Sequence, residues 1–159
     1  MATKSKQSYA AEEAEAAYSI FYEEALREPI KYLKHDARAH DDEALYRLAN
    51  RHGMAYYGLY WLLAELLTGR KDHSYDVSDE AGWRRLAWDL SCMELIDVDD
   101  CKAFVAELAA LDLISREQLS EMQKVVITRI RLDANAYAER TASKKLGAWK
   151  TNRNRLYGS

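Results

Sequence analysis

The sequence predicts a mainly α-helical protein with one small β-hairpin. One proline and six glycines in 159 residues are too few for a fold made of many short strands and turns. Apolar residues make up 48% of the chain, which is enough to fill a hydrophobic core. The stretch from Gly53 to Leu67 carries a single charge, Glu65, and its apolar side chains run round the whole helical circumference. We therefore expect a buried central helix with the other elements packed round it.

The N-terminal segment is expected to form an amphipathic helix. Residues Ser8 to Arg27 are strong helix formers, and Pro29 ends the run because proline cannot continue a helix. Two interpretations of the apolar stripe stay open: it packs on the protein's own domain, or it binds a second copy or another protein. The second interpretation predicts a homo-oligomer, most simply a dimer, with Tyr18, Phe21 and Tyr22 at the interface. The stripe comprises Ala14, Tyr18, Phe21, Tyr22 and Leu26.

Histidines and aspartates gather before the central helix, at His35, Asp36, His40, Asp41 and Asp42. Their spacing matches no zinc signature and no cysteine is adjacent, so no metal is expected there. Asp41 or Asp42 is better suited to cap a helix from Glu43 to Arg51. Gly53 then breaks the chain before the central helix, and Gly69 can end that helix in the left-handed conformation.

Two short amphipathic helices follow, and a tight turn joins them. The first spans Asp79 to Ser91, and Arg84 and Arg85 lie off its apolar stripe. That stripe consists of Trp83, Leu86, Ala87 and Leu90. Asp97 is a fitting N-cap for the second helix, which runs to Leu111. Its expected buried face comprises Cys101, Phe104, Val105 and Leu108. Two such helices form a helix-turn-helix.

A wing is predicted after these two helices. Leu113 to Ser115 is one candidate strand, and Arg116 to Met122 is a loop or helical turn. Lys124 to Arg131 alternates apolar and polar side chains, so it is expected to be the second strand. Tyr75 to Val77 is a further short strand candidate. A helix, a helix-turn-helix and a β-hairpin, in that order, predict a winged helix.

The C-terminal end of the chain is basic. Residues from Arg129 to Ser159 include eight basic and two acidic side chains, a net charge of +6, while the other 128 residues carry −9. The segment from Asp133 is expected to begin as a helix and to break at Gly147. A basic end on an acidic body is typical of a segment that binds a polyanion or a partner, the alternative being a solvated tail. Three regions are thus predicted: residues 1–29, 30–132 and 133–159.

Several segments between residues 30 and 155 together resemble a known family. They are Tyr32–Asp36, His52–Leu63, Asp79–Leu90, Val105–Ile114 and Ile127–Ile130, followed by a Lys/Arg/Ala-rich end. They are similar to the DnaD-like winged-helix domain at the N-terminus of phage and prophage replication proteins, and the run His-Gly-Met-Ala-Tyr-Tyr-Gly-Leu-Tyr is the most specific part. The resemblance implies a winged helix, a role in replication or its regulation in a phage or mobile element, and self-association. It implies no catalysis.

The expected recognition helix is acidic. Between Asp97 and Asp112 five carboxylates stand against Lys102 alone, a net charge of −4, whereas a helix in the major groove passes close to phosphates. If double-stranded DNA is bound, we expect other residues to contact it, although some of them could instead pair with acids or face solvent. These candidates are Arg84, Arg85, Arg129, Arg131, Lys144, Lys145, Lys150, Arg153 and Arg155.

The acidic helix supports a second hypothesis. A phage-encoded module could use an acidic surface to occupy the nucleic-acid groove of a host protein, such as a defence nuclease, in the manner of an anti-CRISPR protein. Its partner-binding residues would be Asp97, Asp99, Asp100 and Glu107.

No enzyme, cofactor or metal site is expected. The chain has no Gly-rich phosphate loop, no Gly-x-Ser-x-Gly, no His-Glu-x-x-His and no Cys-x-x-Cys motif. Cys92 and Cys101 are expected to be free thiols of a reducing compartment. No signal peptide or membrane anchor is apparent, so we expect the protein in the cytoplasm of a bacterial host cell.

Overall fold

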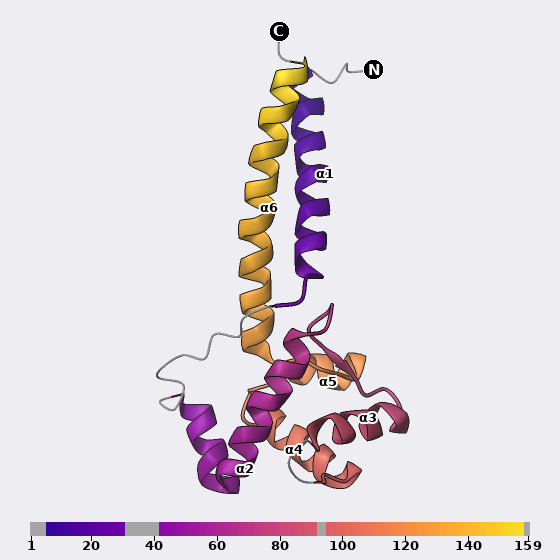
Figure 1. Cartoon of the computed structure of the whole chain (residues 1–159), viewed down its shortest axis with the longest axis vertical. Coiled ribbons are helices and arrows are strands. Elements are labelled where there is room, and N and C mark those ends of the chain that lie inside the picture. Colours follow the sequence, from indigo (N-terminus) through magenta and orange to yellow (C-terminus); the bar gives the residue numbers. More distant parts are fainter. Residues whose placement is uncertain (1–5, 31–41, 92–94, 158–159) are drawn as a thin grey trace. The chain divides into compact units, whose positions relative to one another are not determined.

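The computed structural model describes residues 6–30, 42–91 and 95–157, and it confirms a mainly α-helical fold with a small sheet (Figure 1). Its elements are α1 (Lys6–Leu26), α2 (Glu43–Thr68), β1 (Tyr75–Asp76), α3 (Glu80–Leu90), α4 (Val98–Ala110), α5 (Arg116–Met122), β2 (Lys124–Val125) and α6 (Thr128–Tyr157). The chain divides into two compact units. We call residues 1–28 and 133–159 the hairpin unit, and residues 29–132 the core unit.

The hairpin unit is a pair of antiparallel helices. Contacts between α1 and α6 include Glu13 with Arg153 and Glu24 with Lys145, and Glu28, just after α1, contacts Tyr137 of α6. The residue number falls along α6 as it rises along α1, so the two helices run in opposite directions, as Figure 1 shows.

The core unit is built round the second half of α2. Its core joins α2 side chains to apolar side chains of α3, α4 and the segment from Ile114 to Ile130. Fully burying each large aliphatic side chain contributes about 1.5–3 kcal/mol. The largest fully buried side chains include Leu63, Leu67, Leu86, Leu90, Phe104, Leu108, Ile114 and Ile127.

The prediction of a helix buried all round is correct only for part of α2. Tyr60, Leu63 and Leu67 are buried, but Met54 is 72% exposed. Gly53 adopts φ 79° and ψ −176°, so it kinks α2 where the sequence predicted a break. The helical segment after this kink therefore begins at the surface and becomes buried in steps: Tyr56 and Tyr57 are partly buried against the core, and Tyr60 is the first buried residue.

Polar caps fix where the helices begin. Asp42 Oδ1 accepts hydrogen bonds from the backbone N–H groups of Ala44 (3.0 Å) and Leu45 (3.1 Å), and Asp97 Oδ1 accepts one from Asp100 (2.8 Å). Both predicted caps are thus confirmed, the first at Asp42. Gly69 does follow α2, but the prediction of a left-handed cap is wrong because its φ is −76°.

The sheet differs from the predicted wing. Strand β2 pairs antiparallel with β1, with Tyr75 opposite Val125 and Asp76 opposite Lys124, while a single bridge joins Ile114 to Ile127. The predicted strand Lys124–Arg131 is wrong beyond Ile127, because α6 begins at Thr128. The apolar positions that decide this are helically spaced: Ile127, Ile130, Ala134, Ala138 and Ala142 are all buried.

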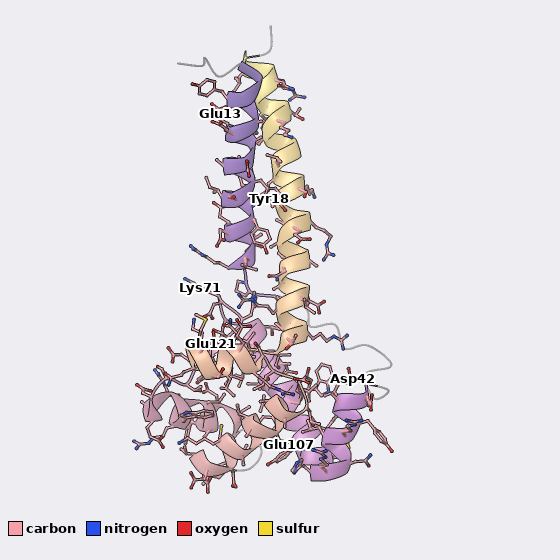
Figure 2. The ribbon with its side chains drawn as sticks, turned by 180° about the vertical axis from the view of Figure 1, so that it is seen from behind. Glu13, Tyr18, Asp42, Lys71, Glu107 and Glu121 are labelled. Carbon is pink, nitrogen blue, oxygen red and sulfur yellow. The ribbon has the colours of Figure 1, made fainter. Side chains whose placement is uncertain are left out.

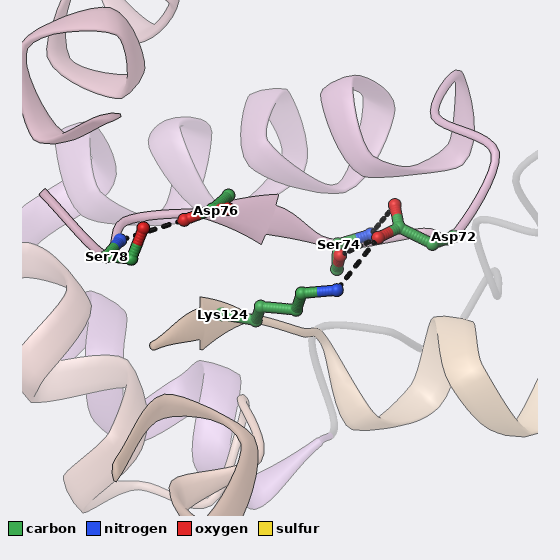
Figure 3. A network of polar contacts seen from close by, with 5 residues as sticks. All are labelled: Asp72, Ser74, Asp76, Ser78 and Lys124. Atoms are coloured by element: carbon green, nitrogen blue, oxygen red, sulfur yellow. Dashed lines mark hydrogen bonds and ion pairs between the residues drawn. The ribbon is translucent and has the colours of Figure 1, made fainter. Parts of the chain in front are cut away.

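A polar network surrounds the paired strands (Figure 3). Asp72 Oδ2 accepts hydrogen bonds from Ser74 Oγ (2.5 Å) and Lys124 Nζ (3.4 Å), and Asp76 Oδ1 accepts one from the Ser78 N–H (2.9 Å). Burial alone would raise the pKa of Asp72, but the Ser74 and Lys124 contacts outweigh it and lower that pKa. The carboxylate of Asp72 therefore stays ionised. Through Lys124 it links the segment before β1 to strand β2.

The predicted break at Gly147 is wrong. Helix α6 continues through this residue to Tyr157, and the Gly147 carbonyl accepts a hydrogen bond from Thr151 Oγ1 (3.0 Å). A glycine inside a helix costs only about 1 kcal/mol relative to alanine, which the surrounding helix and its contacts with α1 offset.

Two glycine substitutions should change stability in opposite directions. A Cβ at Gly82 would lie 2.6 Å from the backbone oxygen of Asp76 and 3.1 Å from Val77 Cα, so Gly82→Ala must push α3 from β1. We expect it to cost about 1–3 kcal/mol. A Cβ at Gly147 meets nothing within 4 Å, so Gly147→Ala should stabilise α6 by up to about 1 kcal/mol.

Denaturant unfolding followed by circular dichroism measures both effects. Equal stability of Gly82→Ala and the wild type would show that α3 does not pack on β1 as closely as described.

Candidate nucleic-acid interface

A shallow hollow of about 400 Å³ lies on the core unit beside β1 and α3. It collects three arginines and two aromatic side chains within one surface. It is lined by the residue after the α2 cap, by both residues of β1 and by the outer face of α3. The lining residues are Arg70, Tyr75, Asp76, Arg84, Arg85, Trp88 and Asp89.

The way α3 packs decides which of its side chains face outward. Asp79 caps the helix by accepting a hydrogen bond from the Gly82 N–H at 2.6 Å. Leu86, Ala87 and Leu90 are buried in the core, which confirms the predicted stripe except that Trp83 is only partly buried. The opposite face carries Arg84, Arg85 and Trp88, spaced three and four residues apart as neighbours on a helix surface are. The indole of Trp88 therefore stands beside two cations at the surface.

Tyr75 lines the hollow and keeps one protonation state. Its hydroxyl donates to Asp89 Oδ2 at 2.6 Å, and the Arg70 guanidinium carbon lies 4.4 Å from the centre of its ring. Burial, together with the hydrogen bond to Asp89, raises the pKa of Tyr75 to about 12. Tyr75 thus remains a neutral donor at physiological pH, and its ring holds Arg70 by a cation–π contact.

The charges of the hollow favour an anion beside α3. Three arginines face two carboxylates, one of which accepts from Tyr75 and the other, Asp76, from Ser78. Neither Arg84 nor Arg85 forms an ion pair with a carboxylate of residues 6–30, 42–91 or 95–157. Both are exposed and available to bind phosphate.

Arg129 and Arg131, two further predicted DNA contacts of the core unit, are not among the residues that line the hollow. Arg129 and Arg131 lie in the first turn of α6 and not on a wing strand, so their predicted position is wrong. Arg131 is exposed and Arg129 is partly buried.

The basic C-terminal residues lie on α6 in the hairpin unit, and α1 engages two of them. Lys145 Nζ is 3.4 Å from Glu24 Oε2 and lies over the ring of Phe21. Arg153 pairs at 2.5 Å with Glu13, which Figure 2 labels on α1. Residues 133–159 hold six basic and two acidic side chains, and residues 1–28 hold three and six, so the hairpin unit carries only +1. The remaining predicted contacts, Lys144, Lys150 and Arg155, are exposed.

The aromatic stripe of α1 is used within the chain. Tyr18, Phe21 and Tyr22 are partly buried, and the Tyr18 and Tyr22 rings stack with centres 6.3 Å apart. Lys145 of α6 lies 5.9 Å from the centre of the Phe21 ring, which places this stripe at the contact with α6. The interpretation that the helix packs on its own chain therefore holds, and self-association through these residues stays a prediction.

The acidic residues of α4 fall into two groups. Asp97 is occupied as the helix cap, and Glu107 Oε1 accepts from Arg51 at 2.9 Å and lies 3.4 Å from His52 Nε2. The Arg51 hydrogen bond, supported by His52, lowers the pKa of Glu107. Asp99 and Asp100 are exposed. Two of the four predicted partner-binding carboxylates, Asp97 and Glu107, therefore already make contacts within the fold.

Five of the seven residues that line the hollow were absent from the predicted site, among them Trp88, Arg70 and Tyr75. Trp88 could have been found from the sequence, because it lies off the buried stripe at helical spacing from Arg84 and Arg85. Arg70 and Tyr75 could not be found in this way, because their contact depends on the path of the chain between the end of α2 and β1.

Other candidate chemistry is limited in the described residues. No group of three or more His, Cys, Asp or Glu side chains is placed there to hold a metal ion, and His35, Asp36, His40, Asp41 and Cys92 lie outside that part of the chain. Cys101 is buried, and burial raises the pKa of its thiol to about 11. None of the described helices combines the length and hydropathy needed to cross a bilayer.

Comparison with known proteins gives no match to a protein-family model, a curated protein or a solved structure.

Lys145 and Arg153, which contact α1, should matter for stability, whereas Lys144 and Lys150 should not. Replacing both Lys145 and Arg153 with alanine removes two partly exposed ion pairs and two cation–π contacts, so we expect a loss of about 1 kcal/mol. The matched control replaces Lys144 and Lys150, which carry the same charge on the same helix.

Thermal unfolding of the full chain compares the two double variants. A control variant that unfolds as early as the Lys145/Arg153 variant would contradict the assignment of these cations to the α1–α6 contact.

Proposed function

We propose that the core unit is a winged-helix-type DNA-binding module that contacts double-stranded DNA through the hollow beside β1 and α3. The observation that carries this proposal is the cluster of Arg84, Arg85 and Trp88 on the outer face of α3, with Arg70 beside it. Arginines bind phosphate oxygens, and each phosphate that they neutralise releases counterions and favours binding.

The order of elements supports a winged helix. An initial helix, α2, precedes a short strand, β1, and the helix pair α3 and α4. The chain then returns antiparallel through the Ile114–Ile127 bridge and through β2, which pairs with β1. The short helix α5 connects these last segments in place of a tight hairpin turn.

The acidity of α4 explains why another surface is proposed for DNA. In a helix-turn-helix the second helix enters the major groove, where it lies between two rows of phosphates. Asp99 and Asp100 are exposed at the start of α4 and would be repelled there. We therefore assign the contact to α3 and β1, and the resemblance to phage replication domains directs the proposal to replication or its control in a phage or mobile element.

The exposed acids also favour a second candidate function. Asp99 and Asp100 form an accessible acidic start to α4, which suits a basic surface on another protein. The protein would then act as a phage-encoded inhibitor of a host nucleic-acid-binding protein.

A salt titration of duplex binding tests the DNA proposal. In a fluorescence anisotropy assay with a random-sequence duplex, replacing Arg84 and Arg85 with glutamine should weaken binding by about tenfold. The slope of log affinity against log salt is negative, and its magnitude should decrease by about 1.8, because two phosphate contacts are lost. The matched control, Lys144→Gln with Lys150→Gln, should change affinity by less than about twofold.

Two results would reject the proposed site. If the control variant lost as much affinity as the Arg84/Arg85 variant, the contact would belong to α6. No duplex binding by the wild type even at low salt would reject DNA binding and favour the second candidate, with Asp99→Asn and Asp100→Asn as the next variants.

A further inference from the structure

Trp88 is the most exposed of the four tryptophans in the chain. It is 76% exposed, whereas Trp61, Trp83 and Trp149 are all partly buried. A large aromatic side chain normally buries its rings, because removing apolar surface from water is favourable. Trp88 lies on the outer face of α3, with Arg84 and Arg85 as helical neighbours. An exposed aromatic ring next to two positive charges suits a nucleic-acid ligand.

Resting on the proposed function, we infer that the hollow binds an unpaired stretch of DNA by stacking a nucleobase on Trp88 while Arg84 and Arg85 contact neighbouring phosphates. A base inside a duplex already has both faces stacked, so it cannot offer one to the indole. A single-stranded base can, and stacking on an aromatic ring is the usual way in which proteins bind single strands.

The two carboxylates of the hollow fit an unpaired base better than a phosphate. Asp76 and Asp89 would repel a phosphate that approached them, but a carboxylate oxygen accepts hydrogen bonds from the amino groups of bases. Asp76 already accepts hydrogen bonds from both the backbone and the side chain of Ser78. Asp89 uses Oδ2 for the Tyr75 hydroxyl, and within the described residues its Oδ1 accepts no hydrogen bond, so Oδ1 can accept one from a base. Phosphates would lie toward Arg84 and Arg85, and the base would lie toward Trp88 and the aspartates.

The test compares three labelled ligands with the full chain: a mixed-sequence single strand, the same sequence as a duplex, and a single strand of equal length with abasic sites. Anisotropy at fixed salt should give tighter binding of the single strand than of the abasic strand, because only the former has bases to stack. Trp88→Ala should weaken binding of the single strand by roughly tenfold and of the duplex by less than about twofold.

Four further measurements sharpen the result. Trp88→Phe should keep most of the affinity because it keeps an aromatic face, and Trp149→Ala, on α6, should have no effect. The salt slope should be the same for Trp88→Ala as for the wild type, since no charge is removed. Circular dichroism of Trp88→Ala should match the wild type, because the side chain is exposed.

The outcomes separate this inference from the proposed function. Equal binding of the abasic and normal strands, or a Trp88→Ala variant that binds single strands as the wild type does, would overturn the stacking inference while duplex binding through Arg84 and Arg85 stood. Absence of binding to every DNA ligand at low salt would overturn both.

Discussion

The close approach of α3 to the backbone of β1 sets the outward face of the core unit. Gly82 sits where a single added carbon would lie 2.6 Å from the Asp76 carbonyl oxygen, and Asp79 caps the helix one turn before. With this first turn fixed, Leu86 and Leu90 point into the core. Their burial leaves Arg84, Arg85 and Trp88 on the opposite side, next to the Tyr75–Arg70 contact. The candidate interface is therefore a consequence of how one helix packs on one short strand.

Charge is distributed differently in the two units. In the hairpin unit, acids of α1 neutralise much of the basic end of α6, and Lys145 and Arg153 contribute to the contact between these helices. In the described part of the core unit, no ion pair joins the acids of α4 to Arg84 or Arg85 of α3. The net charge of the basic end alone predicted a polyanion-binding tail, but ion pairs within the fold determine which cations are available.

The sequence was sufficient to predict the elements whose signal is local. The caps at Asp42 and Asp97 and the buried stripes of α3 and α4 follow from residue type and helical spacing, and they are confirmed apart from Trp83, which is only partly buried. The strand predicted through Arg131 failed because a few alternating residues also fit the start of a helix, and only the spacing up to Ala142 distinguishes them. The pairing of Tyr75 with Arg70, and of α1 acids with α6 cations, depends on tertiary contacts that no local pattern encodes.

Hydrogen–deuterium exchange of the full chain with and without DNA tests the central claim most directly, because it reports which surface the ligand covers. DNA should slow exchange in the segments containing β1 and α3, from Arg70 to Leu90, and leave α4 and the last turns of α6 unchanged. Slower exchange confined to α4 would contradict the claim and place the ligand on the acidic helix. Slower exchange confined to α6 beyond Arg140 would place it on the basic end.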